Sequence, residues 1–135
     1  MRELGIGFVA YSPFSRGLLS GELSGAELAP DDMRRGLPRF SEDNLGFNQS
    51  LVARLGELAA EVGCSPAQFA LAWLVAQGVV PIPGAQRRAH MAENASAGAV
   101  TLTPEILRQV DEIAPPGAFA GKRFPEHLLA MVQED

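Results

Sequence analysis

The sequence lacks several features that would restrict its chemistry. It contains a single cysteine, Cys64, which excludes an internal disulfide and favours a reducing compartment. No histidine or acidic residue neighbours Cys64, so we expect it to be a buried, small apolar residue. The amino-terminal apolar stretch is too short to span a membrane, and no small-residue cleavage pattern accompanies it. We therefore expect a cytoplasmic protein.

Excess positive charge is also missing. The chain has 16 acidic against 11 basic residues, a formal net charge of −5, and only one of its cations is a lysine. This balance argues against a general surface for nucleic acid or for an anionic membrane. With 135 residues, 47% of them hydrophobic and 20% charged, the chain is typical of one globular domain at most.

Sequence motifs for the common catalytic and metal centres are absent. There is no CxxC, HExxH, GxSxG, GxGxxG or Walker-type loop. The two histidines, His90 and His127, are isolated and lack the spacing of metal ligands. Asp31 and Asp32 are adjacent, so their side chains point apart, and we interpret them as solvated loop charges. The residues alone therefore indicate no acid–base, nucleophilic or metal site.

Hydrophobic periodicity and capping residues predict alternating strands and helices. The predicted order is a strand over 6–11, a loop over 12–48, helices over 49–62 and 65–78, a strand over 79–84, helices over 88–97 and from Thr103 to 113, and a tail over 114–135 with one short last helix. Gly63 is expected as a left-handed C-cap. Ser65 precedes Pro66 and is expected to form a capping box with Gln68.

Two strands separated by helices form a βαβ unit, so we predict an α/β fold with parallel strands. The first strand has no polar alternation, which predicts that both of its faces are covered. The helix over 65–78 is apolar on most of its circumference, so we expect it to be deeply buried, with Phe69 and Trp73 in the core. Two strands alone make too narrow a sheet to bury such helices.

The segment after the second strand is suited to binding an anion. The sequence PIPGAQRRAHMAEN, residues 81–94, places a Pro-Gly turn after the strand and two arginines at the start of a helix. Gly84 permits close backbone approach, and the helix N-terminus offers free N–H groups. Arg87 and Arg88 supply donors that suit phosphate. The alternative is that both are surface arginines on a loop.

The end of the first strand has a matching pattern. Tyr11 ends the strand, and ligands bind at the carboxyl ends of strands in α/β folds. Its flat ring could stack on a ligand ring, while Ser12, Ser15 and Arg16 could hold phosphate oxygens. Alternatively, Tyr11 is a half-buried packing residue and Arg16 is a loop cation.

Together these segments resemble the aldo-keto reductase family, in particular its bacterial NADPH-dependent subgroup. The stretches AYSPFSRGLLSG, LPRF, SPAQFALAWLVAQGVVPIPG and RRAHMAENASA match in order and spacing over nearly the entire chain. The resemblance implies a (β/α)8 TIM barrel that binds NADP(H) across its C-terminal face. Strands 6–11 and 79–82 would be the seventh and eighth of the barrel. Residues 1–135 would then form one partial domain, the C-terminal portion, with 114–135 as its tail.

The resemblance also implies a cofactor site. Tyr11 matches the tyrosine that stacks on the nicotinamide. The other implied cofactor residues are Ser12, Phe14 and Arg16 in the loop over the pyrophosphate, Gly84, Ala85, Gln86 and Arg87 in the loop around the adenosine 2′-phosphate, His90 near that phosphate or the adenine, and Glu93 and Asn94 on the adenine. No catalytic residue or metal ligand is implied within the chain.

Two departures from the family pattern limit this inference. Ala85 and Gln86 stand where the subgroup usually has a hydroxyl residue and a Lys or Arg, so we expect a weak preference for NADPH over NADH. The catalytic Asp, Tyr, Lys and His of the family come from the first half of the barrel, which this sequence does not include. The only tyrosine, Tyr11, matches the nicotinamide platform, and the only lysine, Lys122, lies in the tail.

The sequence therefore leads to two hypotheses. In the first, the chain is the cofactor-binding C-terminal portion of an NADPH-dependent enzyme. That enzyme reduces a small-molecule aldehyde or ketone to an alcohol and has no nucleic-acid or membrane partner. We then expect the isolated chain to be an inactive, poorly soluble fragment. In the second, the chain is a non-catalytic nucleotide-binding or regulatory module that docks on another barrel half.

Overall fold

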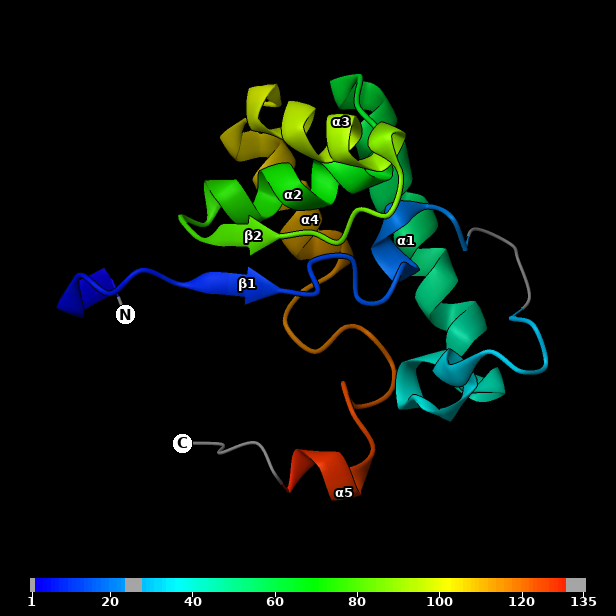
Figure 1. The fold of residues 1–135 in the computed structure, drawn as a ribbon. Coiled ribbons are helices and arrows are strands. Elements are labelled where there is room, and N and C mark those ends of the chain that lie inside the picture. The colour runs from blue at the N-terminus through cyan, green and yellow to red at the C-terminus, as the bar shows by residue number, and fades with distance from the viewer. Residues whose placement is uncertain (1, 24–27, 131–135) are drawn as a thin grey trace.

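The computed structural model describes residues 2–23 and 28–130, and its strands form a small parallel sheet (Figure 1). Strand β1 (Val9–Tyr11) pairs with β2 (Val80–Ile82), with Tyr11 opposite Ile82. The Val80 N–H extends this pairing by donating to the Phe8 carbonyl at 2.9 Å. The predicted α/β class with parallel strands is confirmed, although both strands are shorter than the sequence predicts.

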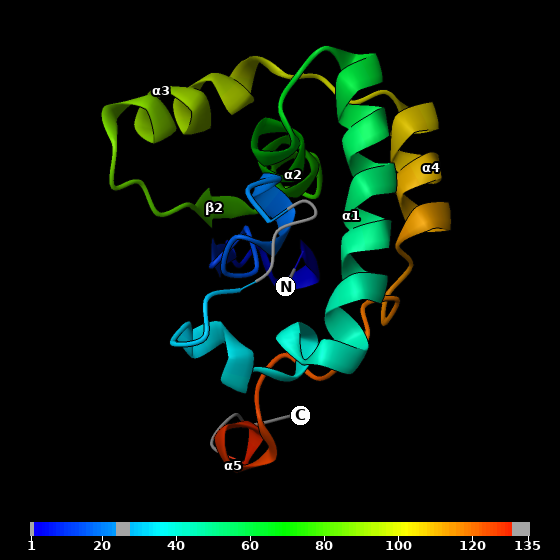
Figure 2. The same ribbon diagram turned by 90° about the vertical axis from the view of Figure 1, so that its right-hand side faces the viewer.

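Helices pack on one another beside this sheet, and Figure 2 shows α1 and α4 running side by side. Helix α2 packs against β2, and α1 and α3 both pack against α2. The helical elements are η1 (Arg2–Leu4), η2 (Leu18–Ser20), η3 (Met33–Gly36), η4 (Pro38–Phe40), α1 (Glu42–Val62), α2 (Pro66–Ala76), α3 (Arg88–Ser96), η5 (Ala97–Ala99), α4 (Pro104–Ile113) and α5 (Glu126–Leu129), where η marks a 3-10 helix.

The prediction that β1 is covered on both faces is wrong. Burial alternates along both strands: Ala10 and Pro81 are partly buried, whereas their neighbours on the opposite face are exposed. Val9, Tyr11, Val80 and Ile82 on that face are 58%, 55%, 61% and 52% exposed. None of the described helices covers this apolar face, because α2 packs on one side of the sheet only.

The prediction of a loop over 12–48 is wrong in part. Three 3-10 turns lie within it, and α1 begins at Glu42 rather than at Gln49. Two acidic residues open the helix, Glu42 and Asp43, and negative charge stabilises a helix N-terminus. Gly46 lies in the next turn. Because glycine is a poor helix former and interrupts the hydrophobic pattern, the sequence predicted a later start for this helix.

The core consists of two clusters that share α1. The first gathers the turns before α1 and contains Leu18, Leu23, Leu28, Phe40 and Val52. The second lies between α1, α2 and α4 and contains Leu58, Ala59, Phe69 and Val110. Phe69 is therefore a core residue, as predicted, and Trp73 packs against this second cluster while remaining partly exposed. Helix α1 therefore contributes side chains to both clusters.

The local capping signals are confirmed. Gly63 ends α1 with φ of 80°. The Ser65 side chain accepts from the Gln68 N–H at 3.2 Å, and the Gln68 side chain accepts from the Ser65 N–H at 2.8 Å. Thr103 caps α4 by accepting from the N–H of Ile106. Helix α2 ends at Ala76, slightly before the predicted end, and its last residues are exposed.

Within the described ranges, no single helix is both long and apolar enough to span a membrane. Helices α1 and α2 reach that length and composition only when taken together, and they are bent by 85° where they meet.

Replacing Ser65 with alanine removes the cap of α2, so we expect the free energy of unfolding to fall by about 1–2 kcal/mol. Chemical denaturation followed by circular dichroism measures this loss. Ser50→Ala is the matched control, because Ser50 is exposed on α1 and its hydroxyl donates to the Phe47 carbonyl of the same helix. The control should change stability by less than about 0.5 kcal/mol. Equal losses in the two variants would contradict the capping role.

Candidate functional site

Both predicted binding segments begin at the same edge of the sheet. Because β1 and β2 run parallel with Tyr11 opposite Ile82, their carboxyl ends lie side by side. The loop that starts at Ser12 leaves one strand there, and the turn at Gly84 follows the other. The structure thus brings the two segments together, while the roles of their residues in binding stay predictions.

Tyr11 presents its ring at this edge of the sheet. Tyr11 is 55% exposed and lies on the face of β1 that none of the described helices covers. The guanidinium carbon of Arg123 lies 4.5 Å from the centroid of the Tyr11 ring, a cation–π contact. Arg123 and Arg16 also lie within 5.5 and 5.9 Å of the Phe124 ring. The tail therefore meets the strand end at Tyr11.

The loop after Tyr11 has a left-handed backbone at residues other than glycine. Ser12, Ser15 and Arg16 have φ of 53°, 47° and 58°, and Gly17 follows with φ of 89°. For an L-residue this conformation costs about 1–2 kcal/mol. Backbone strain of this kind gathers at functional sites, where surrounding contacts maintain it.

The hydrogen bonds inside this loop leave several donors without a partner. The N–H of Ser15 donates to the Ser12 carbonyl at 3.0 Å, and that of Gly17 donates to the Phe14 carbonyl at 3.0 Å. Among the described residues, the N–H groups of Phe14 and Arg16 and the hydroxyls of Ser12 and Ser15 have no hydrogen-bond partner. These unpaired N–H and hydroxyl groups are donors that an anion could accept from.

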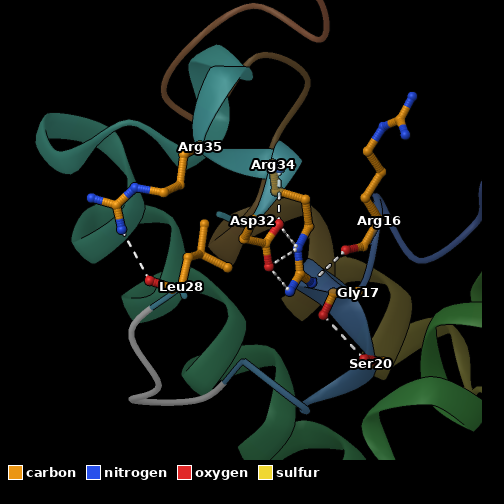
Figure 3. A network of polar contacts seen from close by, with 7 residues as sticks. All are labelled: Arg16, Gly17, Ser20, Leu28, Asp32, Arg34 and Arg35. Atoms are coloured by element: carbon orange, nitrogen blue, oxygen red, sulfur yellow. Dashed lines mark hydrogen bonds and ion pairs between the residues drawn. The ribbon is translucent and has the colours of Figure 1, made fainter. Parts of the chain in front are cut away.

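A pair of oppositely charged residues supports the loop from behind (Figure 3). The Arg34 guanidinium donates from Nε to both Asp32 carboxylate oxygens, at 3.0 and 3.1 Å, and from Nη2 to Oδ2 at 2.6 Å. Its Nη1 donates to the Arg16 carbonyl at 3.1 Å. The same nitrogen would lie 3.3 Å from a Cβ at Gly17, so the close approach favours glycine there. Ser20 closes the turn by donating to the Gly17 carbonyl at 3.0 Å.

This pair corrects the interpretation of Asp32 as a solvated loop charge. Asp32 caps η3 by accepting from the Arg34 N–H at 2.9 Å, and its side chain is 17% exposed. The hydrogen bonds from the Arg34 side chain and main chain lower the pKa of the Asp32 carboxyl from 3.8 to about 2. The interpretation missed a local signal, because an aspartate two residues before an arginine suits both an N-cap and an ion pair.

A cleft of about 480 Å³ lies between the loop, the helices and the tail. Its floor is apolar and includes Val52, Phe69 and Trp73, whose indole N–H has no hydrogen-bond partner among the described residues. The charged residues that line it are Arg16, Arg39 and Arg123, with no carboxylate. Burial, and then the nearby charge of Arg123, lower the pKa of Arg39. The rim of the cleft is therefore uniformly basic in a chain of negative net charge.

One buried side chain ties the tail to the body of the protein. Asn48 of α1 is 0% exposed. It donates from Nδ2 to the Ala120 carbonyl at 3.0 Å and to the Arg39 carbonyl at 2.9 Å, and its Oδ1 accepts from the Ala120 N–H at 2.8 Å. Next to it, a Cβ at Gly121 would lie 2.6 Å from the Pro38 carbonyl oxygen. These contacts fix the tail segment that reaches Tyr11.

The second predicted segment is exposed around its turn and firmly docked farther along. Gly84, Ala85, Gln86 and Arg87 are all exposed, and Asn94 donates to the Gly84 carbonyl at 3.3 Å. Neither Arg87 nor its neighbour Arg88 forms an ion pair within the described residues. The turn thus presents unneutralised guanidinium groups at the start of α3.

Polar contacts to α2 and to the segment after η2 hold α3 in place. Glu93, which the resemblance implies on the adenine, accepts a hydrogen bond from the Ser65 hydroxyl at 2.5 Å and so joins α3 to the cap of α2. His90 lies 3.5 Å from Glu22 (Nε2 to Oε1). This contact joins α3 to the segment that follows η2.

The remaining reactive residues do not form a second centre. Cys64 is partly buried against the second core cluster, and burial raises the pKa of its thiol, which fits the expected packing role. Lys122 forms an ion pair with Glu126. Across residues 2–23 and 28–130, no group of three or more His, Cys, Asp or Glu side chains is placed to hold a metal ion.

Known proteins were compared with this chain by sequence and by fold, and both comparisons find enzymes of one family. The sequence model of the aldo/keto reductase family matches residues 1–115. Among solved structures, the fold is similar to a glycerol dehydrogenase from Gluconobacter oxydans, with a TM-score of 0.75 and 26% sequence identity. The match covers 83% of this chain and 35% of that enzyme, so the chain spans about a third of its relative's length.

Asn48→Ala should release the tail. The substitution leaves main-chain groups at Ala120 and Arg39 unpaired, so we expect a loss of about 2–3 kcal/mol in the free energy of unfolding. Trypsin should then cleave faster after Lys122 and Arg123. Asn44→Ala is the control, because Asn44 lies on the same helix and donates to the Pro38 carbonyl at 2.8 Å. Unchanged cleavage in Asn48→Ala would contradict the tethering role.

The ion pair of Asp32 predicts a dependence of stability on pH. Because the pKa of Asp32 is lower in the folded chain, its ionised form stabilises the fold. This stabilisation is complete above about pH 4 and is lost as the pH falls toward about 2. Asp32→Asn should therefore lower the thermal unfolding temperature at neutral pH, with the difference from the parent closing toward pH 2. Asp31→Asn controls for the lost negative charge, and a difference that stays constant with pH would refute the assignment.

Proposed function

The chain belongs to the aldo/keto reductase family, and from this we propose that it is the dinucleotide-binding part of an oxidoreductase. The reaction is the reduction of an aldehyde or ketone to an alcohol. A relative of similar fold is called a glycerol dehydrogenase, an enzyme of the same alcohol–carbonyl chemistry. The observation that carries the proposal is the row of unpaired donors after β1, beside the exposed arginines after β2.

The family fold is a (β/α)8 barrel, and we place β1 and β2 as its seventh and eighth strands. The exposed apolar side chains of Val9, Tyr11, Val80 and Ile82 support this placement, because the inward-facing side chains of such barrels are packed together in layers. In this arrangement α1 and α2 belong to the outer ring of helices. Both loops then lie at the C-terminal mouth, where ligands of TIM barrels bind.

The residues at that edge fit a nicotinamide dinucleotide such as NADP(H). The unpaired N–H of Arg16 and the Ser12 and Ser15 hydroxyls suit the diphosphate. Arg87, exposed and without a carboxylate partner in the described chain, suits the 2′-phosphate. One feature fits less well, since Glu93 is already bonded to Ser65. When bound in its reduced form, the dinucleotide would supply a hydride to the carbonyl carbon.

The chain's own residues then hold and orient the reactants. Tyr11 offers a half-exposed ring that would hold the nicotinamide by stacking, and Arg123 lies against the same ring. Reduction also needs an acid that gives a proton to the carbonyl oxygen. We place that acid outside this chain, because Tyr11 is the only tyrosine and Lys122, the only lysine, is paired with Glu126.

A chain without its own acid also fits the second hypothesis, a non-catalytic module. A nucleotide-binding or regulatory module would keep the same loops and have no turnover in any assembly. The two are distinguished by adding the missing barrel half of a family member: NADPH oxidation with a carbonyl substrate supports the enzyme, and binding without turnover supports the module. Turnover by this chain alone would overturn our placement of the acid.

The cofactor site is tested by titrating NADPH and NADH while following the fluorescence of Trp73, the only tryptophan, which lines the cleft beside Tyr11. Arg87→Ala should raise the dissociation constant for NADPH about tenfold and that for NADH less than about twofold, because only NADPH carries the 2′-phosphate. Tyr11→Ala should weaken both cofactors alike.

The parent chain should prefer NADPH only weakly, since Ala85 and Gln86 supply neither a hydroxyl nor a charge. Arg54→Ala is the control, because Arg54 is exposed on α1 and does not line the cleft. Absence of NADPH binding by the parent, or equal effects of Arg87→Ala on the two cofactors, would contradict the proposed site.

A further inference from the structure

The left-handed loop from Ser12 to Gly17 needs an external support. Its own hydrogen bonds are short-range turn bonds, such as the one from Leu18 to the Ser15 carbonyl at 3.3 Å. Such bonds fit a left-handed turn of glycines as well as one of serine and arginine, so they do not offset the steric strain of the side chains. Side-chain contacts come from outside the loop: Arg34 donates to the Arg16 carbonyl, the Ser20 hydroxyl donates to the Gly17 carbonyl, and the Phe124 ring lies against the Arg16 side chain. Of these, Arg34 donates to a carbonyl within the left-handed run and is itself held by Asp32.

The Arg34 side chain is itself fixed at both ends (Figure 3). Asp32 accepts three hydrogen bonds from its guanidinium, and the remaining terminal nitrogen points to Arg16. The guanidinium carbon also lies 6.0 Å from the ring of Phe40, a buried residue of the first core cluster. The side chain is 28% exposed. Arg34 therefore connects the strained loop to the core.

Arg34 is a poor candidate for a direct ligand of phosphate. Its charge is paired with Asp32, and each of its three side-chain nitrogens already donates a hydrogen bond within the protein. Arg16, by contrast, has an exposed side chain without a carboxylate partner in the described residues. The two arginines therefore have different roles. Arg16 is exposed to ligand, and Arg34 holds the main chain at Arg16.

We infer that Arg34, oriented by Asp32, is a positioning residue that keeps the Ser12–Gly17 loop in its left-handed, anion-binding form. This inference rests on the proposed function, because the anion it concerns is the diphosphate of the dinucleotide. The support acts through geometry: the hydrogen bond to the Arg16 carbonyl holds the unpaired N–H groups of the loop where the diphosphate meets them.

Three variants separate geometry from charge. Arg34→Ala and Arg34→Lys should both raise the dissociation constant for NADPH about tenfold, because lysine keeps the charge but lacks the planar group that bonds Asp32 and Arg16 together. Arg35→Ala is the matched control, since the neighbouring Arg35 bonds to the Leu28 carbonyl at 2.9 Å and to Glu42 instead of the loop. The control should bind NADPH within about twofold of the parent. Parent-like binding by Arg34→Lys would show that Arg34 acts by charge and would overturn the inference.

A double-mutant cycle tests the role of strain. Glycine adopts positive φ without a steric penalty, so Ser15→Gly should make the loop less dependent on its support. Measured against the Ser15→Gly single variant, loss of Arg34 should weaken NADPH binding less than about threefold, compared with about tenfold in the parent. Equal effects in both backgrounds would refute the strain argument.

A measurement without ligand keeps this inference distinct from the proposed function. Trypsin cleaves after Arg16 only when the loop opens, so Arg34→Ala and Arg34→Lys should be cut there faster than the parent and Arg35→Ala. If the parent fails to bind NADPH but this difference is found, the support of the loop stands and the cofactor assignment fails. If cleavage after Arg16 is unchanged in both Arg34 variants, the support itself is refuted.

Discussion

The parallel hydrogen bonding of β1 and β2 is the constraint on which the rest of the structure depends. It joins a segment near the start of the chain to one that lies beyond α2, so the intervening turns and both helices must close over one face of the sheet. Helices α1 and α2 meet that requirement, and the core around Phe69 results from it. The same pairing sets Tyr11 opposite Ile82, which brings the two predicted binding loops to one edge of the sheet.

Sequence patterns predicted those parts of the fold that depend on neighbouring residues. The capping box at Ser65 and the left-handed end of α1 at Gly63 are local events, fixed by residues within one helical turn. The start of α1 was placed too late because Gly46 interrupts the hydrophobic period. The apolar run of β1 did not by itself reveal the open face, since such a run shows that a strand can be buried, not which partner buries it.

The candidate site divides in the same way. Motifs place Tyr11, the Ser12–Gly17 loop and the turn at Gly84 at strand ends, and the structure agrees with that placement. The residues that hold the site together were missed because their partners are distant: Asn48 bonds to the tail, and Arg34 bonds to the loop after β1. Serine and arginine carry no sequence signal for positive φ, so the strained turn became visible only in three dimensions.

The left-handed turn also limits the routes by which this loop can change in evolution. Positive φ accepts glycine, tolerates asparagine and aspartate, and excludes β-branched side chains, so valine or isoleucine at Ser15 is rejected whatever surrounds it. On the inference drawn above, loss of Arg34 weakens binding while Ser15 is present and weakens it less once glycine has replaced it. Substitutions at these two positions are therefore expected in one order. Glycine replaces Ser15 first, and only then can Arg34 be replaced with little loss of binding.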